Sequence, residues 1–395
     1  MLDPSATTLE FNAFDAQVIQ DPYPYYGRLR QEQPAHWSPE MTSWVLSRHA
    51  DVSAALGMPT LYSSAQGIFP SPTGLSMADA FLPMLIMTDP PRHALLRRAV
   101  SSAFTRKSIH ALENTVRGLV RQLLDQMPWS GLSFDFVEAF SGPLPALVIA
   151  DMMGIPRADL EQFRAWSTKL VQASSRSRDG LDAAAGLYEY FSGHVADRRK
   201  QPKDDLVSAL VHTETDGERL TDAEVLGTCL LLLVAGHETT TNLLSNSMVV
   251  LAEHSPIREV LLDEPRKIPL AVEELLRYDS PVQGLSRTLT ADVELHGERM
   301  STGDTVLLLF GAANRDERAF SRPDQFDIGR GVERNLAFGR GIHFCLGAPL
   351  ARLEARVALE NLLPALGRWS IDRPNSARLA SAPIRGFARL ELAGG

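Results

Sequence analysis

The long run from Thr221 to His254 constrains the fold more than any other feature of this sequence. Thr221 and Glu224 form the pattern Thr-x-x-Glu, which typically caps the first turn of a helix. An apolar run begins at Val225, and the predicted helix reaches about His254, roughly 50 Å at ~1.5 Å per residue. Its first half is apolar on all sides, so we expect it to be buried.

The remaining pattern predicts a mainly α-helical fold with a minor β-sheet part. Asp89-Pro90 resembles an N-cap followed by a proline at the first helical position, and the helix should reach about Phe104. Gly297 and Gly303 punctuate the last two of three predicted strands and suggest a small hairpin sheet. The three strands are Trp44–Leu46, Val293–Leu295 and Thr305–Phe310. Two loops are predicted, at Ser63–Ser76 and Ser174–Gly180. No composition shift marks a linker, so we expect one domain over residues 1–395.

Composition and charge exclude several classes of protein. Hydrophobic residues make up 44% of the chain and charged residues 22%, which is typical of a globular protein. The net charge of −9 argues against nucleic acid as a partner, because phosphate binding needs a basic surface. The first residues do not resemble a secretory signal, and the longest apolar stretch, around Leu230–Val234, is too short to span a bilayer. We therefore expect a cytoplasmic protein without a membrane anchor.

A glycine-rich segment from Phe338 to Gly347 surrounds Cys345, one of only two cysteines in the chain. A helix with an apolar stripe follows it, and the stripe consists of Leu346, Leu350, Leu353 and Val357. The N–H groups at a helix N-terminus favour a thiolate, and the glycines let the backbone approach a flat ligand. Two alternatives are a small buried hydrophobic cysteine and a dinucleotide-binding loop, although Phe344 stands where the latter needs its last glycine.

The same segment resembles the haem-ligand loop of the cytochromes P-450, F-G-x-G-x-H-x-C-x-G, at every fixed position, including Gly347. The resemblance implies the cytochrome P-450 fold, with haem b between the long central helix and the helix after the cysteine. It makes Cys345 the axial ligand of the haem iron, and a thiolate in that place favours O–O cleavage. Phe338 would pack near the sulfur, and His343 would contact a haem propionate. The other cysteine, Cys229, is expected to be inert core.

The long helix contains an unusual stretch, Ala235-Gly236-His237-Glu238-Thr239-Thr240-Thr241. Glycine and threonine are poor helix formers, and a threonine hydroxyl can bond the carbonyl one turn earlier. A simple kink is one interpretation. The stretch also resembles the oxygen-activation motif of the family, A-G-x-[DE]-T. By that match Thr239 would hydrogen-bond oxygen and water, and Glu238 would relay protons.

Two further constellations match the family. Glu274 and Arg277, on a helix opened by Pro269, resemble its E-x-x-R pair, and Arg330 is placed like the third member of that structural network. Taken alone, the Glu274–Arg277 pair would usually be a solvated salt bridge, and the His93–Arg97 pair considered next would be a polar helix face. His93 and Arg97 match the family's H-x-x-x-R, whose side chains bind haem propionates, a charge-assisted contact. Arg287 stands where a further propionate arginine is expected.

Basic residues gather in the segments predicted to flank the cysteine. They are Arg98, Arg106, Lys107, Arg340, Arg352 and Arg356. Such runs are usually solvated surface. The chain has no flavin or iron–sulfur module, so a monooxygenase of this kind would take NAD(P)H-derived electrons from a separate donor. A basic face would suit an acidic ferredoxin, itself reduced by a ferredoxin reductase.

The resemblance also predicts a substrate pocket that is mostly apolar. The loop at about Tyr62–Leu85 would contribute, and the other candidates are Val234, Ala235, Thr239, Gln283, Gly284, Leu285 and Ile384, with Gln283 as the orienting group. We therefore expect a small-to-medium hydrophobic substrate. The leading hypothesis is a monooxygenase that hydroxylates or epoxidises using O2. The alternatives are a peroxygenase-type variant and a non-catalytic haem-thiolate sensor or ligand carrier.

Overall fold

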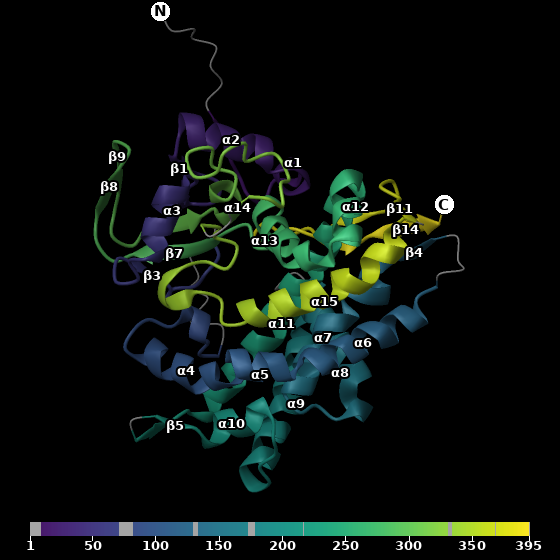
Figure 1. The fold of residues 1–395 in the computed structure, drawn as a ribbon. Helices are drawn as coiled ribbons and strands as arrows, with labels where there is room; N and C mark the ends of the chain where they lie inside the picture. Colours follow the sequence, from purple (N-terminus) through teal and green to yellow (C-terminus); the bar gives the residue numbers. More distant parts are fainter. Residues whose placement is uncertain are drawn as a thin grey trace, which may run out of the picture.

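The computed structural model describes residues 9–70, 82–128, 133–172, 178–215, 217–330, 334–367 and 369–394. Its longest described helix is α11 (Asp222–Glu253), which passes behind α15 in Figure 1. The predicted capping box is confirmed, because the Thr221 side chain accepts from the Glu224 N–H and the Glu224 carboxylate accepts from the Thr221 N–H. The expected burial is confirmed from Val225 to Cys229, whereas Leu230–Leu232 are partly exposed.

Most of the other helices lie on one side of the molecule, and α7, α9, α13 and α15 pack against α11 (Figure 1). The α-helices besides α11 are α1 (Ala16–Gln20), α2 (Tyr23–Glu32), α3 (His49–Leu56), α4 (Arg92–Ser101), α5 (Arg106–Ala111), α6 (Glu113–Gln126), α7 (Pro143–Met152), α8 (Leu160–Gln172), α9 (Arg178–Lys200), α10 (Leu206–His212), α12 (Ser255–Asp263), α13 (Ile268–Tyr278), α14 (Phe310–Ala313) and α15 (Ala348–Leu366). Short 3-10 turns are η2 (Leu85–Met87), η3 (Ser102–Phe104), η5 (Arg157–Asp159), η6 (Pro265–Lys267) and η7 (Gly341–His343), and η4 (Val137–Ser141) is a π-helical turn.

The largest sheet has the strand order β1-β2-β10-β7-β3, and α1–α3 lie on its side of the molecule (Figure 1). Its strands are β1 (Ala35–Ser38), β2 (Ser43–Leu46), β3 (Tyr62–Ser63), β7 (Leu285–Leu289) and β10 (Thr305–Leu308). Val306 of β10 pairs with Trp44 in parallel and with Arg287 in the antiparallel sense. Because this register fixes β7 in the sheet, it fixes the position of the Arg287 backbone.

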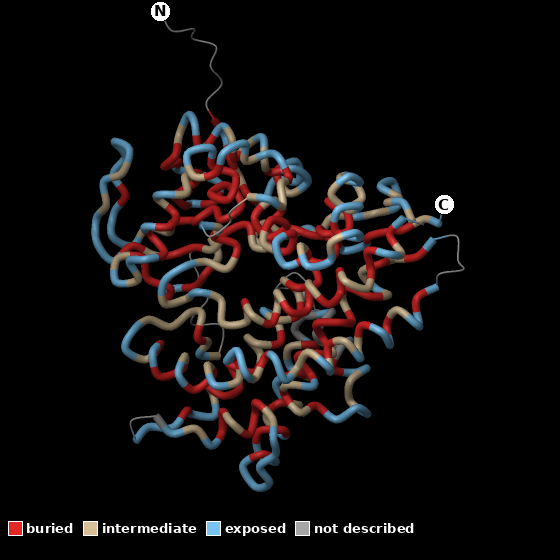
Figure 2. The backbone as a smooth tube through the Cα atoms, viewed as in Figure 1, coloured by how far each residue is buried: buried red, intermediate tan, exposed pale blue. Residues whose placement is uncertain are grey.

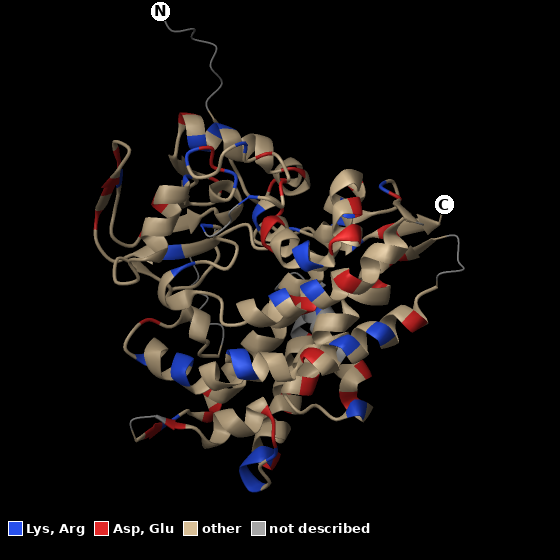
Figure 3. Cartoon of the chain, viewed as in Figure 1, with Lys and Arg blue, Asp and Glu red and all other residues tan. Residues whose placement is uncertain are grey.

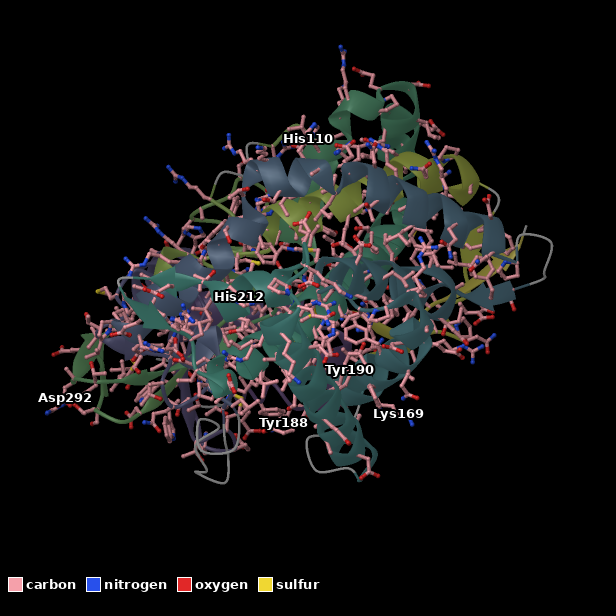
Figure 4. All side chains as sticks on the ribbon, turned by 90° about the horizontal axis from the view of Figure 1, so that it is seen from below. His110, Lys169, Tyr188, Tyr190, His212 and Asp292 are labelled. Carbon is pink, nitrogen blue, oxygen red and sulfur yellow. The ribbon has the colours of Figure 1, made fainter. Side chains whose placement is uncertain are left out.

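The smaller sheets are hairpins and a three-stranded sheet of order β11-β14-β4. Their strands are β4 (Ser133–Asp135), β5 (Glu214–Thr215), β6 (Glu218–Arg219), β8 (Val293–Leu295), β9 (Glu298–Met300), β11 (Trp369–Ile371), β12 (Ala377–Arg378), β13 (Phe387–Arg389) and β14 (Glu391–Gly394). The prediction that Val293–Leu295 and Thr305–Phe310 form one hairpin is wrong. Gly297 has a positive φ and turns β8 directly into β9, while β10 ends at Leu308 inside the large sheet. Asp292, just before this hairpin, marks an edge of the molecule in Figure 4.

Two other local predictions need correction. The helix predicted from Pro90 begins at Arg92, with Pro91 as its N-cap, and it passes into η3 before Phe104. Asp89 does not cap it, because the Asp89 carboxylate is bonded elsewhere, as described below. The predicted loop at Ser174–Gly180 is wrong at its end, where α9 begins at Arg178, and residues 173–177 lie outside the described residues. Of the loop at Ser63–Ser76, Ser63 belongs to β3 and residues 71–76 lie outside the described part.

The buried residues follow the interior of the helical part and the strands of the large sheet, as the red segments of Figure 2 show. The stripe predicted after Cys345 faces this core, since Leu350, Leu353 and Val357 are buried and Leu346 packs against them partly exposed. Of the helices described, none is long and apolar enough to cross a membrane.

Candidate active site

The segment around Cys345 turns sharply before α15. Gly339 and Gly341 have positive φ values of 67° and 71°, which glycine adopts without strain. A Cβ at Gly341 would lie 2.4 Å from the Leu56 carbonyl oxygen, so the end of α3 leaves no room for a side chain there. The Cys345 N–H donates to the Phe338 carbonyl oxygen at 2.9 Å and closes the loop. The Cys345 side chain is thereby held just ahead of the N-terminus of α15.

Opposing forces act on the Cys345 thiol. Burial raises its pKa, whereas the N–H groups of Gly347 and Ala348 and the charges of Arg97 and Arg352 lower it. Cys229 is a useful contrast, since burial raises the pKa of its thiol to about 12 and no cation among the described residues opposes that rise. Burial dominates at Cys345 as well, so its pKa is raised, but the N–H groups and cations beside it oppose the rise and would support the thiolate, the form that binds metals.

Four basic side chains gather beside the cysteine. The His93 and His343 rings lie 4.5 Å apart between centroids, in an edge-to-face arrangement. Burial, and then the charges of Arg287, His93 and Arg97, lower the pKa of His343 to about 3. Burial lowers the pKa of Arg287 to about 10. The four predicted propionate residues thus come from α4, β7 and η7 to one place, next to the sulfur.

This cluster fits a group that brings its own negative charge. The His93 Nε2 atom is buried without a hydrogen-bond partner among the described residues, and a buried unpaired polar atom is costly. Burial and the arginine charges keep the pKa of both histidines low, and the two arginines repel one another unless an anion lies between them. The two propionates of haem would supply those anions, so the residues present fit iron protoporphyrin IX with Cys345 toward the iron.

Asp89 and Ser64 belong to this site, although the sequence analysis did not include them. The Asp89 carboxylate accepts from the Ser64 N–H at 3.0 Å and from the Ser63 hydroxyl, and its charge attracts His93 and Arg287. The Ser64 hydroxyl lies 3.2 Å from His343 Nε2. The signal that could have revealed Asp89 is its place four residues before His93, but its resemblance to an N-cap concealed this role.

The centre of α11 differs from its flanks. Ala235 is exposed, and Glu238 and Thr239 are partly exposed, in the middle of an otherwise largely buried helix. The Thr239 hydroxyl donates to the Ala235 carbonyl oxygen at 2.7 Å, which confirms the bond expected from a mid-helix threonine. Burial raises the pKa of Glu238 to about 7. A carboxyl group with this pKa exchanges protons readily near neutral pH.

The predicted pocket residues have different surroundings. Ala235 is exposed, Val234 and Leu285 are partly buried, and Ile384 is buried. Gly284 packs against β10, because a Cβ there would lie 2.7 Å from the Leu308 carbonyl oxygen.

Gln283 does not have a free amide with which to orient a substrate. Its Oε1 accepts from the Tyr26 hydroxyl at 2.9 Å, and its Nε2 donates to the Ser280 carbonyl oxygen at 2.7 Å. It is 3% exposed. The sequence suggested an orienting group because it could not show that Tyr26, far away in the chain, occupies this amide.

Glu274 and Arg277 form a buried bidentate ion pair, with both N–O distances at 2.8 Å. Arg330 Nε lies 3.3 Å from Glu274 Oε1, so the three predicted members form one network. Arg277 also donates to the carbonyl oxygens of Asn314, Pro323 and Gln325, which ties α13 to the segment that leads toward the cysteine loop.

The residues of the predicted basic face differ in exposure and pairing. Arg98, Arg106 and Lys107 are exposed on α4 and α5, where Figure 3 shows basic residues. Arg352 is paired with Glu273, and Arg356 is paired with Glu113 and Glu360.

Beside these residues lies a groove of about 320 Å³ whose apolar walls include Ile109, Val272 and Leu353. His110, which also lines the groove, stands at the edge of the molecule opposite Tyr188 and Lys169 of α9 and α8 in Figure 4. Arg340 donates to the Ser53 hydroxyl at 2.6 Å.

Comparison with known proteins gives consistent results. Residues 149–366 match the family model described as Cytochrome P450. The chain is 40% identical, over 97% of its length and 96% of the other, to a protein of Mycobacterium tuberculosis named Putative cytochrome P450 123. The structure of CYP109Q5 from Chondromyces apiculatus superposes with a TM-score of 0.89, 34% identity and 98% coverage of both chains. That of CYP109E1 from Bacillus megaterium in complex with testosterone gives 0.85, 35% identity, and coverage of 95% of this chain and 99% of the other.

Proposed function

Because the chain belongs to the cytochrome P450 family, an oxidoreductase class of haem monooxygenases, we propose that it inserts one oxygen atom from O2 into a hydrophobic organic substrate. The observation that carries the proposal is the pair Glu238 and Thr239, which stands partly exposed in the centre of the largely buried α11. A protein that only holds or senses a ligand has no use for a carboxyl group whose pKa is raised to about 7 at this place. This pair therefore favours catalysis over the sensor or carrier alternative.

The cofactor would be held by residues from four parts of the chain. Cys345 would be the axial thiolate, and His93, Arg97, Arg287 and His343 would bind the propionates through charge-assisted hydrogen bonds. When bound, a thiolate-ligated haem supplies O2 binding and O–O cleavage. Phe338 stacks under the Arg352 guanidinium at 4.6 Å, and this contact helps to keep water from the cysteine loop.

The oxygen side would depend on proton delivery by α11. The Thr239 Oγ donates to Ala235, which leaves its lone pairs directed away from the helix and able to accept from water. Glu238 would take a proton from solvent and release it toward that hydroxyl, because its pKa of about 7 makes both forms accessible. Proton transfer by a positioned group is typically worth on the order of 10²–10⁴ in rate.

The pocket favours a neutral, medium-sized, apolar substrate. Val234, Ala235, Leu285 and Ile384 offer no charge, and the amide of Gln283 is occupied. One similar structure, CYP109E1, was solved with testosterone, a neutral steroid of this kind. We therefore propose steroid-sized hydrophobic compounds as the first class to screen, by loss of iron-bound water from the ferric protein.

Electrons would come from a separate ferredoxin and its NAD(P)H-dependent reductase. The exposed cations Arg98, Arg106 and Lys107 lie on α4 and α5, the helices that adjoin the cysteine side, and would steer an acidic partner. We propose that this protein and its electron donors work together in the cytoplasm.

The decisive experiment is the absorption spectrum of the reduced, CO-bound protein. A strongly red-shifted Soret band is expected, because it requires a thiolate opposite CO. Cys345→Ser should abolish the shift, whereas Cys229→Ser, which removes the other thiol, should leave it. A spectrum typical of histidine-ligated haem in the unaltered protein would overturn the proposal. Product formation with peroxide alone, and none with O2 and a ferredoxin chain, would instead support the peroxygenase alternative.

A further inference from the structure

Two asparagines stand on one face of the buried second half of α11. Asn242 and Asn246 are four residues apart, so their side chains share a face of the helix, and each is 2% exposed. Asparagine is a poor helix former, and its buried amide is stable only if both ends are hydrogen-bonded. Both amides therefore need hydrogen-bond partners in the core.

Asn242 joins α11 to a turn near the C-terminus. Its Nδ2 donates to the Glu238 carbonyl oxygen at 2.9 Å, and its Oδ1 accepts from the Phe387 N–H at 3.2 Å. A Cβ at Gly386 would lie 1.7 Å from the Asn242 Oδ1, so the backbone of the turn approaches the amide as closely as glycine allows. One side chain thus contacts both the Glu238 backbone and the turn.

The same turn is held at its other end, so it is fixed as a unit. Asn246 Nδ2 donates to the Arg385 carbonyl oxygen at 3.0 Å, and the Arg385 N–H donates to the Pro281 carbonyl oxygen at 2.7 Å. Arg385 Nε is 2.7 Å from the buried Asp279 carboxylate. Ile384, between these anchors, pairs with Val282 in a β-bridge.

We propose that Asn242 is a positioning residue that fixes the distance between Ile384 in this turn and Glu238 on α11, and thereby fixes one dimension of the substrate pocket. This inference rests on the proposed function, because only then do Ile384 and Glu238 border one pocket. Without the Asn242 amide, the Phe387 N–H loses its acceptor, and of the two described hydrogen bonds from α11 to this turn only that of Asn246 to Arg385 remains, so the turn is less tightly held against the helix. The bond to Asn242 therefore acts on substrate through Ile384, not through direct contact.

The test uses the haem-loaded ferric protein and two ligands that bind the iron. Imidazole is small and mainly senses the iron, whereas the phenyl ring of 4-phenylimidazole also packs against the pocket wall. Their dissociation constants are measured by absorbance titration. For Asn242→Ala we expect 4-phenylimidazole to bind about fivefold more weakly and imidazole to change by less than about twofold.

Three matched variants separate positioning from general damage. Asn242→Ser is too short to reach the Phe387 N–H but can still bond the Glu238 carbonyl, so it should behave like Asn242→Ala, and it serves if the alanine variant does not fold. Asn242→Asp retains the acceptor for Phe387 and should retain the affinity for 4-phenylimidazole. Thr241→Val removes a buried bond to the His237 carbonyl without touching the turn, and should leave the ratio of the two constants unchanged.

Two results would overturn the inference while leaving the proposed function intact. One is an unchanged ratio in both Asn242→Ala and Asn242→Ser, with the thiolate band of the CO complex present. The other is an equal change of the ratio in Thr241→Val. Absence of the thiolate band from the unaltered protein would overturn the proposed function, and this inference with it.

Discussion

Two acidic side chains, Glu274 on the cysteine side and Glu238 in the centre of α11, have opposite surroundings. On the cysteine side, Glu274 is 0% exposed but bonds Arg277 and Arg330, and the Cys345 thiol has N–H groups and cations beside it. In the centre of α11, burial raises the pKa of Glu238 to about 7, and no cation in the described part of the chain opposes it. A buried acid that is paired with cations keeps its charge, whereas a buried acid without such partners has a pKa near neutral pH and can gain or lose its proton.

The difference separates two tasks that one active site needs. A haem ligand and its supports must hold one ionisation state through every turnover. A proton relay must change its state, which requires a pKa near the working pH. Among the described residues, Glu274 is therefore paired with two arginines, whereas Glu238 has no ion-pair partner.

The largest effect on stability is expected from removing the anion of the buried Glu274–Arg277 ion pair. Glu274→Gln leaves Arg277 buried without its anion, and the free energy of unfolding in urea should fall by about 3–5 kcal/mol. Glu273→Gln removes the neighbouring carboxylate, whose partner Arg352 is partly exposed, and should cost less than about 1 kcal/mol. Equal losses in the two variants would contradict the distinction between the buried and the exposed pair.

The next largest effect is expected on turnover, from changes to Glu238 and Thr239 in the centre of α11. Glu238→Gln cannot release a proton, and the rate of product formation with a surrogate ferredoxin chain should fall on the order of 10²-fold. Thr239→Ala should lower the yield of product per NAD(P)H consumed. Both variants should retain the thiolate band of the CO complex, because they leave the cysteine side unchanged. Undiminished turnover in either would show that the relay assignment is wrong.

The pKa of Glu238 also predicts how stability varies with pH. Its carboxyl binds its proton more tightly in the folded chain than in the unfolded one, where the pKa is near 4.5. The stabilisation from the protonated form is complete below about pH 4.5 and is lost as the pH rises through about 7. The melting temperature should therefore drop more between pH 5 and 8 in the unaltered protein than in Glu238→Gln, by the equivalent of about 1–3 kcal/mol. Identical pH profiles would contradict the shift.

The smallest effect is expected on the surface. Arg106→Ala with Lys107→Ala should slow ferredoxin-dependent reduction a few-fold at low salt, and the difference should vanish at about 1 M salt, where charges are screened. Arg299→Ala, on the exposed β8–β9 hairpin, is the matched control and should have no effect. A rate that depends equally on Arg299 would argue against docking near α4 and α5.

Local signals in the sequence predicted much of the fold and of the site. The capping box predicted the start of α11, Pro269 the start of α13, and the glycines around Cys345 the turn before α15. The hairpin prediction failed because strand partners depend on residues far apart, such as Trp44 beside Val306. Asp89 was mistaken for a cap because its serine partners could not be seen from its own neighbourhood.

Local sequence patterns specify the chemistry available to this protein: a cysteine in a glycine loop, an acid–alcohol pair in a long helix and basic residues at helical spacing. These are local patterns, and backbone propensity and short-range bonding determine them. Which buried charges have ion-pair partners, and which amides are hydrogen-bonded, depends instead on how the chain folds. The hydrogen-bond partners of these amides are far away in the chain, such as Tyr26 for Gln283 and Phe387 for Asn242. Burial sets the pKa of Glu238, and burial exists only once the chain has folded around it.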